Sequence, residues 1–227
     1  MPEEKMDEIT VERLCEEMRR GSRVILQVRH AERPKMDPDD PTFGDALELT
    51  EEGRRTSRVL GGMLAEFRDD VQFCASPLTR TRMTAGLIAE GMGLSDAEIP
   101  VDDRLGNSSF YYDDPAEVLD VFKPENFFNA CFEYFATGRQ RGFRELYLAT
   151  EELERWLVGR FTRRFFIVVT HDLYIAAFLY AKGAVGRFTR ENWTRFIDGG
   201  AIIIAPDGTR RYALVRSGLS TGICGVK

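Results

Sequence analysis

Short runs of consecutive apolar residues alternate along the chain with segments in which apolar residues recur every three or four positions. Continuous apolar runs, typical of strands buried in a parallel sheet, occupy residues 24–28, 71–75 and 165–170. Helical spacing predicts helices over residues 8–20, 51–67, 79–90, 151–161 and 173–181. This alternation predicts an α/β fold, a three-layer α/β/α sandwich whose central sheet is mostly parallel.

The remaining segments complete this picture. Residues 201–205 and 212–215 flank the turn Pro206-Asp207-Gly208 and predict a β-hairpin, which would add an antiparallel edge to the sheet. A short edge strand is expected over 99–101. Residues 107–149 are rich in aromatic side chains and are interpreted as a helical insertion. With no internal repeat or low-complexity linker, a single domain over residues 1–227 is the simplest organisation.

Composition narrows the class of protein. The chain has 227 residues, of which 43% are hydrophobic and 30% charged, values that exclude a wholly disordered chain. No apolar run approaches the roughly 20 residues that span a bilayer, and the acidic N-terminus lacks a secretion signal, so a cytoplasmic protein without membrane association is expected. The net charge of −6 argues against a nucleic-acid partner. Four scattered cysteines indicate reduced thiols rather than disulfides or a zinc site.

The chain has two histidines, and both directly follow strongly apolar strands. His30 comes after the run 24–28, and His171 after the run 165–170. Ligands of open α/β sheets bind at the carboxyl ends of the strands, so both imidazoles are candidates for one crevice. A single histidine is more often structural, but two at equivalent strand ends favour a site.

Arginine dominates the basic residues, with 26 Arg against 5 Lys. Genomic bias is enough to explain this ratio. The positions of the arginines, rather than their number, therefore decide whether they indicate an anion-binding pocket. Arg29 and Arg33 flank His30, and Arg80 opens the helix after the second strand, where free N–H groups and the helix dipole favour anions. Arg82 lies about 200° around that helix from Arg80, so only one of the two should face the crevice. These arginines and both histidines predict a pocket for a small phosphorylated substrate, although Arg33 and Arg80 could instead form surface ion pairs with the acidic run 37–40.

Four motifs then occur in a recognisable order over roughly residues 24–182. They are Arg29-His30-Ala31-Glu32-Arg33-Pro34, Leu49-Thr50-Glu51-Glu52-Gly53-Arg54, Ser76-Pro77-Leu78-Thr79-Arg80-Thr81-Arg82-Met83-Thr84-Ala85 and Thr170-His171-Asp172. They resemble the R-H-G, L-T-x-x-G, S-P-L-x-R-x-x-x-T-A and second-histidine motifs of the histidine phosphatase superfamily, which has the phosphoglycerate mutase-like fold. One motif alone would be weak, whereas the ordered set is specific.

The resemblance implies that His30 is the nucleophile and forms a phosphohistidine. Arg29, Arg33, Arg80 and His171 would hold the phosphoryl oxygens. Phosphoryl transfer chiefly needs positioning and neutralisation of charge, which these side chains can supply. No metal or other cofactor is therefore expected.

The sequence departs from the family pattern in two places. Ala31 replaces the usual glycine, and its methyl group would crowd the loop if φ were positive there. In the mutase-like branch a glutamate in an R-L-x-E segment protonates the leaving group, but the matching residue here is Asn107. The acid-phosphatase branch places an aspartate directly after the second histidine, so Asp172 is assigned as the general acid. Asp172 could instead cap the following helix, and Glu32 is a weaker candidate for the acid.

Three other interpretations remain open. A phosphomutase would use the same pocket but return the phosphoryl group to a substrate. A catalytically inactive module that binds phosphorylated ligands is favoured by Ala31. A metal site built from His30, His171 and Asp172 is disfavoured because the flanking arginines would repel the cation. Residues 107–149 are expected to pack over the crevice, where their aromatic side chains would either fill a hydrophobic core or form a wall that contacts the substrate. The sequence pattern does not indicate an oligomeric state.

Overall fold

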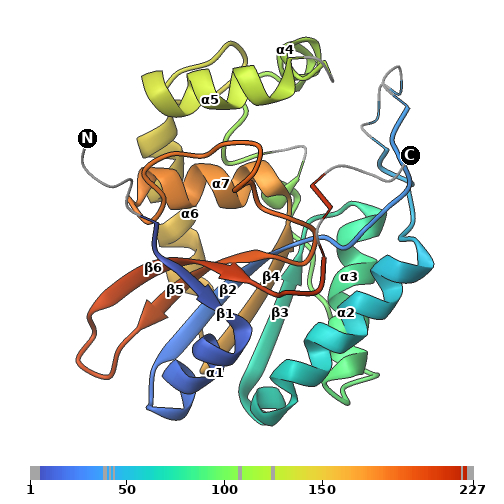
Figure 1. Cartoon of the computed structure of the whole chain (residues 1–227), viewed down its shortest axis with the longest axis vertical. Coiled ribbons are helices and arrows are strands. Elements are labelled where there is room, and N and C mark those ends of the chain that lie inside the picture. The colour runs from blue at the N-terminus through green and yellow to red at the C-terminus, as the bar shows by residue number, and fades with distance from the viewer. Residues whose placement is uncertain are drawn as a thin grey trace.

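A computed structural model describes residues 6–37, 40, 42, 44–106, 109–123, 126–220 and 222–223. Within these ranges, six strands form one sheet in the order β1-β6-β5-β2-β4-β3 (Figure 1). The strands are β1 (Glu8–Thr10), β2 (Arg23–Arg29), β3 (Val71–Ala75), β4 (Phe165–Thr170), β5 (Gly199–Ile204) and β6 (Arg210–Arg216). Strands β2, β4 and β3 are parallel to one another, whereas β5 runs antiparallel to both β2 and β6. The mostly parallel centre that the apolar runs predict is confirmed.

Helices cover both faces of this sheet. The α-helices are α1 (Val11–Arg19), α2 (Glu51–Leu64), α3 (Thr79–Gly91), α4 (Pro115–Val121), α5 (Phe127–Thr137), α6 (Leu146–Arg160) and α7 (Asp172–Ala181), and the 3-10 helices are η1 (Ala65–Asp70) and η2 (Asp103–Leu105). One core contains side chains of α1, α2 and α3, and the other contains side chains of α5, α6 and α7. The three-layer α/β/α sandwich is therefore confirmed.

The central strands are continuously apolar because they are buried on both faces. In β2, Val24 and Leu26 pack into the core under α1–α3, while Ile25 between them packs into the core under α6 and α7. All six residues of β4 are buried. This double burial positions the carboxyl ends of β2 and β4 side by side, with Arg29 paired to Thr170.

Glycines let α2 and α3 approach each other closely. A β-carbon at Gly61 would lie 2.1 Å from the carbonyl oxygen of Ile88, and one at Gly91 would lie 2.1 Å from that of Arg58. Both separations are far too short for side-chain carbon, so the two helices meet backbone to backbone. This contact fixes α3, and with it Arg80, against the sheet.

Several local predictions are wrong. Residues 8–10, expected to begin the first helix, form β1, which pairs in parallel with β6. The hairpin is present, but β1 rather than the hairpin is the outermost strand on that side. Residues 99–101 contribute only a bridge between Val101 and Ala75.

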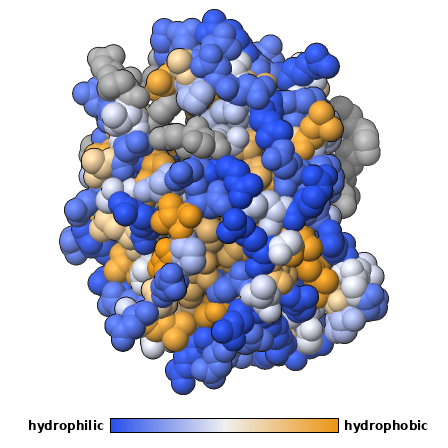
Figure 2. Space-filling model, turned by 180° about the vertical axis from the view of Figure 1, so that it is seen from behind, coloured by the Kyte–Doolittle hydropathy of each residue, from blue (hydrophilic) through white to orange (hydrophobic). Residues whose placement is uncertain are grey.

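The aromatic segment forms a tier beyond α7. Helices α4 and α5 lie there, at the top of Figure 1, and α5 packs against α7. No helix in the described ranges has the length and apolar character needed to cross a membrane. On the face seen in Figure 2, hydrophilic residues interrupt the hydrophobic groups.

Candidate active site

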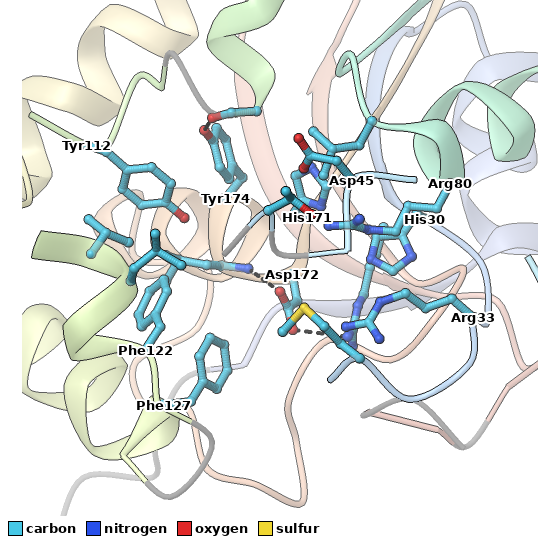
Figure 3. A pocket seen from close by; sticks show the side chains of 18 of the residues that line it. His30, Arg33, Asp45, Arg80, Tyr112, Phe122, Phe127, His171, Asp172 and Tyr174 are labelled. Atoms are coloured by element: carbon cyan, nitrogen blue, oxygen red, sulfur yellow. Dashed lines mark hydrogen bonds and ion pairs between the residues drawn. The ribbon is translucent and has the colours of Figure 1, made fainter. Parts of the chain in front are cut away.

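The structure brings the two histidines together. His30 follows β2, His171 follows the adjacent strand β4, and the backbone N–H of His30 donates to the carbonyl of Thr170. The imidazole centroids are 5.5 Å apart, with 64° between the ring planes (Figure 3). Both rings line one cavity, so the prediction that they share a crevice agrees with the geometry.

One hydrogen bond fixes the tautomer of His30. Its Nδ1 lies 2.9 Å from the carbonyl oxygen of Ala31. A carbonyl can only accept, so Nδ1 carries the proton and Nε2 keeps a lone pair. Burial lowers the pKa of His30 well below its usual 6.5, and Arg80, His171 and Arg29 lower it further. The ring is therefore a neutral imidazole at neutral pH, the form that can act as a nucleophile.

A chain of hydroxyl groups orients His171. Its Nε2 lies 3.1 Å from Oγ of Ser76, and that oxygen lies 2.8 Å from Oγ1 of Thr81. Thr81 donates its hydroxyl proton to the carbonyl of Leu78, so Ser76 donates to Thr81 and accepts from Nε2–H of His171. Burial lowers the pKa of His171 well below its usual value, and Arg80, Arg29 and Arg33 contribute in the same direction.

Arg29 is held rigidly beside the histidines. The side chain is 4% exposed, and its guanidinium donates to the carbonyl oxygens of Thr194 (2.6 Å) and Ile223 (2.9 Å). It also lies 3.1 Å from Oδ2 of Asp172 and 4.4 Å from the ring centroid of Phe196. These contacts leave the guanidinium little conformational freedom, which reduces the entropic cost of binding an anion.

Arg80 enters the same cavity from α3. It is 6% exposed and donates to the carbonyl of Gly44 (2.8 Å). Burial lowers its pKa to about 10, with a further contribution from Arg33, so the group remains cationic at neutral pH. Arg82 is exposed, as the helical angle predicts. Arg33 lines the cavity from the loop after β2.

Asp172 is the first residue of α7, and its carboxylate borders the cavity. Oδ1 accepts from the backbone N–H of Leu173 (3.0 Å), and Oδ2 accepts from Nε1 of Trp193 (3.1 Å) and faces Arg29. His171 occupies the N-cap position, so Asp172 is not the N-cap residue, although it does bind one free N–H of the helix terminus.

The cavity has a volume of about 580 Å³ and joins two unlike walls. One wall carries the charged side chains and both imidazoles, and the other is aromatic and aliphatic (Figure 3). Four cationic side chains and two anionic ones line it: Arg29, Arg33, Lys35, Arg80, Asp45 and Asp172. Among the described residues, no cluster of three His, Cys, Asp or Glu side chains could hold a metal ion. The geometry therefore provides an anion-binding site with a net positive lining.

Comparison with known proteins identifies the family. The family model of the histidine phosphatase superfamily (branch 1) matches residues 25–196, more than half of the chain. The chain belongs to this superfamily. No curated protein matches the sequence. The match to the family model confirms the resemblance that the four ordered motifs indicated.

Solved structures show the same fold. A protein described as mycobacterial hydrolase 1 is 18% identical, with a TM-score of 0.54, and the match covers 85% of this chain and 96% of that one. A mycobacterial glucosyl-3-phosphoglycerate phosphatase is 17% identical, with a TM-score of 0.53, over 85% of this chain and 97% of that one. At these identities the likeness establishes the phosphoglycerate mutase-like fold alone.

The superfamily motifs have structural roles around the histidines. Thr50 is the N-cap residue of α2, and a β-carbon at Gly53 would lie 2.2 Å from the carbonyl oxygen of Glu32. The glycine of the second motif therefore lets α2 start against the loop that follows His30. Glu32 accepts a hydrogen bond from the Thr50 hydroxyl (2.7 Å) and is not among the residues that line the cavity.

Ala31 fits its position without strain. Among the described residues, Ile197 alone combines a side chain with a positive φ, so Ala31 does not need the conformation that favours glycine. Its methyl group is fully buried, and its N–H donates to the Thr84 hydroxyl (3.0 Å). The feature that favoured an inactive binding module thus does not distort the loop. Asn107, the position of the missing glutamate, lies outside the described residues.

The family match is to branch 1, so the resemblance of Asp172 to the acid-phosphatase branch gains no support from it. Any role of Asp172 in catalysis rests on its contacts in the cavity. The structure also adds a second carboxylate, Asp45, which lines the cavity from the loop before α2 (Figure 3). No pattern in the sequence selects Asp45.

The loop 193–198 also contributes to the site, although the sequence pattern gave no reason to expect it there. Trp193 binds Asp172, Thr194 binds Arg29, and the ring of Phe196 lies 5.6 Å from that of His30. The loop contains Ile197, a buried β-branched residue with φ of 65°, a conformation that costs on the order of 1–3 kcal/mol. No local pattern marks this loop, because its partners lie 21 or more residues away along the chain.

Proposed function

We propose that the chain is a metal-independent phosphatase that hydrolyses a phosphomonoester through a phosphohistidine on His30. One observation carries the proposal: a neutral imidazole with a lone pair on Nε2 lines a cavity that Arg29, Arg33 and Arg80 also line. The guanidinium groups neutralise the phosphoryl oxygens and would repel a metal cation.

The reaction proceeds in two displacements. Nε2 of His30 attacks phosphorus, so that a P–N bond forms while the P–O bond to the alcohol breaks and the leaving oxygen takes a proton from a carboxylic acid. Water then attacks phosphorus, its proton returns to that carboxylate, and the P–N bond breaks to release inorganic phosphate. Arg29, Arg80 and Arg33 hold the phosphoryl oxygens in both steps. His171 joins them when the bound dianion raises its pKa, so that Nδ1 takes up a proton while Nε2 still donates to Ser76.

Asp172 is the proposed proton donor, because its carboxylate borders the cavity beside Arg29. To donate a proton, it must exchange one of its present hydrogen bonds for the substrate oxygen. Asp45 is the competing carboxylate. A general acid matters most for a poor leaving group, so Asp172→Asn should slow alkyl phosphate hydrolysis about 10²–10⁴-fold and p-nitrophenyl phosphate hydrolysis much less. The same selective loss in Asp45→Asn, with none in Asp172→Asn, would transfer the role to Asp45.

Hydrolysis of p-nitrophenyl phosphate in EDTA tests the reaction itself. We expect turnover that is unaffected by the chelator, is abolished by His30→Ala, and falls about 10²–10³-fold in Arg80→Ala. Arg82→Ala is the matched control, because that arginine is exposed on the same helix, and its activity should be unchanged. Activity that disappears in EDTA would overturn the metal-free mechanism.

The intermediate can be trapped directly. Brief mixing with ³²P-labelled substrate followed by an alkaline quench should leave label on the wild-type protein and none on His30→Ala, because phosphohistidine is stable in alkali. Recovery of the label on a second organic product, rather than as inorganic phosphate, would indicate a phosphomutase.

A further inference from the structure

Among the described residues, the second wall of the cavity carries no charged side chain. Seven lining residues come from the segment between Tyr112 and Phe128, and none of them carries a charge: Tyr112, Pro115, Val118, Leu119, Phe122, Phe127 and Phe128. The charged lining residues all come from other segments of the chain. Figure 3 shows Tyr112, Phe122 and Phe127 across the cavity from Arg33 and Arg80.

Helix α4 directs its charged residues away from this wall. Asp120 forms ion pairs with Lys123 and Arg141, and all three side chains are more than half exposed. Val118 and Leu119, on the same helix, line the cavity instead. The sequence of α4 therefore separates a charged outer face from an apolar face that borders the site.

Aromatic contacts hold the wall in place without a ligand. The ring centroid of Phe122 lies 5.0 Å from that of Phe127 and 5.3 Å from that of Phe143. Phe128 packs at 5.3 Å against Trp193, whose Nε1 binds Asp172. Such tilted and edge-to-face pairs make a rigid surface, so the wall is preformed for its ligand and connected to the phosphate end.

A preformed apolar wall disfavours ligands whose polar groups would find no hydrogen-bond partner on it. Among the described residues of the wall, the Tyr112 hydroxyl is the one polar side-chain group. The hydroxyl groups of a sugar or further phosphate groups would lose their water there without gaining hydrogen bonds, which is costly. An apolar group would instead gain from leaving water.

We infer that the substrate is a phosphomonoester of an apolar alcohol, an alkyl chain or an aromatic ring, whose organic part occupies the wall formed by α4 and α5. The inference rests on the proposed function for the phosphate end of the cavity. It identifies the class of substrate that the superfamily membership leaves open.

A series of n-alkyl phosphates from ethyl to hexyl tests the inference, since the leaving groups are chemically alike and differ in length. We expect kcat/KM to rise about three- to fourfold per added methylene until the chain leaves the cavity. Hexyl phosphate should also be a better substrate than 3-phosphoglycerate, which has a charged organic part. A flat series, or preference for 3-phosphoglycerate, would overturn the inference.

Leu119 offers a variant that spares the fold. It lines the cavity but belongs to neither hydrophobic core, whereas Leu148 on α6 is 70% exposed and lies outside the cavity. Leu119→Asn should lower kcat/KM about three- to tenfold for hexyl phosphate and leave ethyl phosphate unchanged. Leu148→Asn, the matched control, should change neither. Equal losses on both substrates in Leu119→Asn would contradict a role in binding the organic part.

Binding separates this inference from the proposed reaction. Ethyl- and hexylphosphonic acid cannot be hydrolysed, and calorimetry measures their affinity without turnover. Tighter binding of the hexyl compound, weakened by Leu119→Asn, would support the substrate class even if the chain hydrolysed no phosphomonoester. Equal binding of both compounds by an active phosphatase would reject the substrate class and leave the reaction standing.

Discussion

The two histidines make the stability of the protein depend on pH in a way that can be calculated. Burial holds both imidazoles neutral, with pKa values well below 6.5 in the folded protein, while in the unfolded chain they titrate near 6.5. The unfolded state therefore binds more protons as the pH falls below 6.5. The free energy of unfolding must decrease on acidification through that window and be fully recovered above it.

The size of the effect follows from the protons that the unfolded state gains. While a buried imidazole stays neutral, each pH unit below 6.5 costs on the order of 1 kcal/mol per histidine. Between pH 7.5 and 5.5 the pair should therefore lower the free energy of unfolding by roughly 2–3 kcal/mol. His30→Gln removes one titrating group, so its loss should be smaller by about 1 kcal/mol. The carboxylates titrate in both wild type and His30→Gln, so their contribution cancels when the two stability losses are compared.

Equilibrium urea unfolding, followed by tryptophan fluorescence in buffers without phosphate, measures these losses. NMR gives an independent readout, because the chain contains only two histidines and hence two imidazole signals. Neither signal should shift through pH 6.5 in the folded protein. Orthophosphate should move both titrations upward, since the bound anion offsets the repulsion from Arg80 and Arg29. Equal stability losses in wild type and His30→Gln, or a histidine that titrates at 6.5 in the free protein, would refute the reasoning.

Four substitutions give further expectations. Arg29→Lys removes the guanidinium fork and should lower kcat/KM for p-nitrophenyl phosphate about 10²–10³-fold; a loss below tenfold would contradict its role. Gly61→Ala places a methyl group against the carbonyl of Ile88 and should lower the free energy of unfolding by about 3 kcal/mol or more, measured with urea. Gly62→Ala, whose nearest neighbour would be 4.0 Å away, should be neutral or slightly stabilising. Ala31→Gly should leave kcat/KM within about twofold and cost about 1 kcal/mol of stability; a tenfold gain in activity would show that Ala31 distorts the loop.

The parts of the fold that could be predicted are those in which local pattern and burial coincide. The apolar run over 165–170 matches β4 in full, because that strand is buried on both faces. The choice of Arg80 over Arg82 required only the angle between successive helical residues. Strand β1 could not be recognised, because its three residues alternate in exposure and are held by β6, some 200 residues away along the chain.

The same distinction, between residues marked by a local pattern and residues held by tertiary contacts, applies to the site. His30, His171 and Asp172 follow strands whose pattern is strong, so their convergence could be expected from the rule for strand ends. Ser76 likewise follows β3 and opens the third motif. Asp45 and Trp193, in contrast, reach the site through tertiary contacts that leave no periodic signal. These two side chains are ordinary in sequence, and they become informative only when their partners are known.

Charge and apolar surface in the cavity favour the same kind of ligand. The four cationic and two anionic side chains leave a net charge of +2 on the lining, within a protein of net charge −6. A phosphomonoester dianion balances that lining, whereas a di- or triphosphate would place excess negative charge against Asp45 and Asp172. Any group beyond the single phosphate then meets the apolar wall of α4 and α5, where additional charge would be desolvated without a partner. Both walls of the cavity therefore support the proposed ligand, with one phosphate and an apolar remainder.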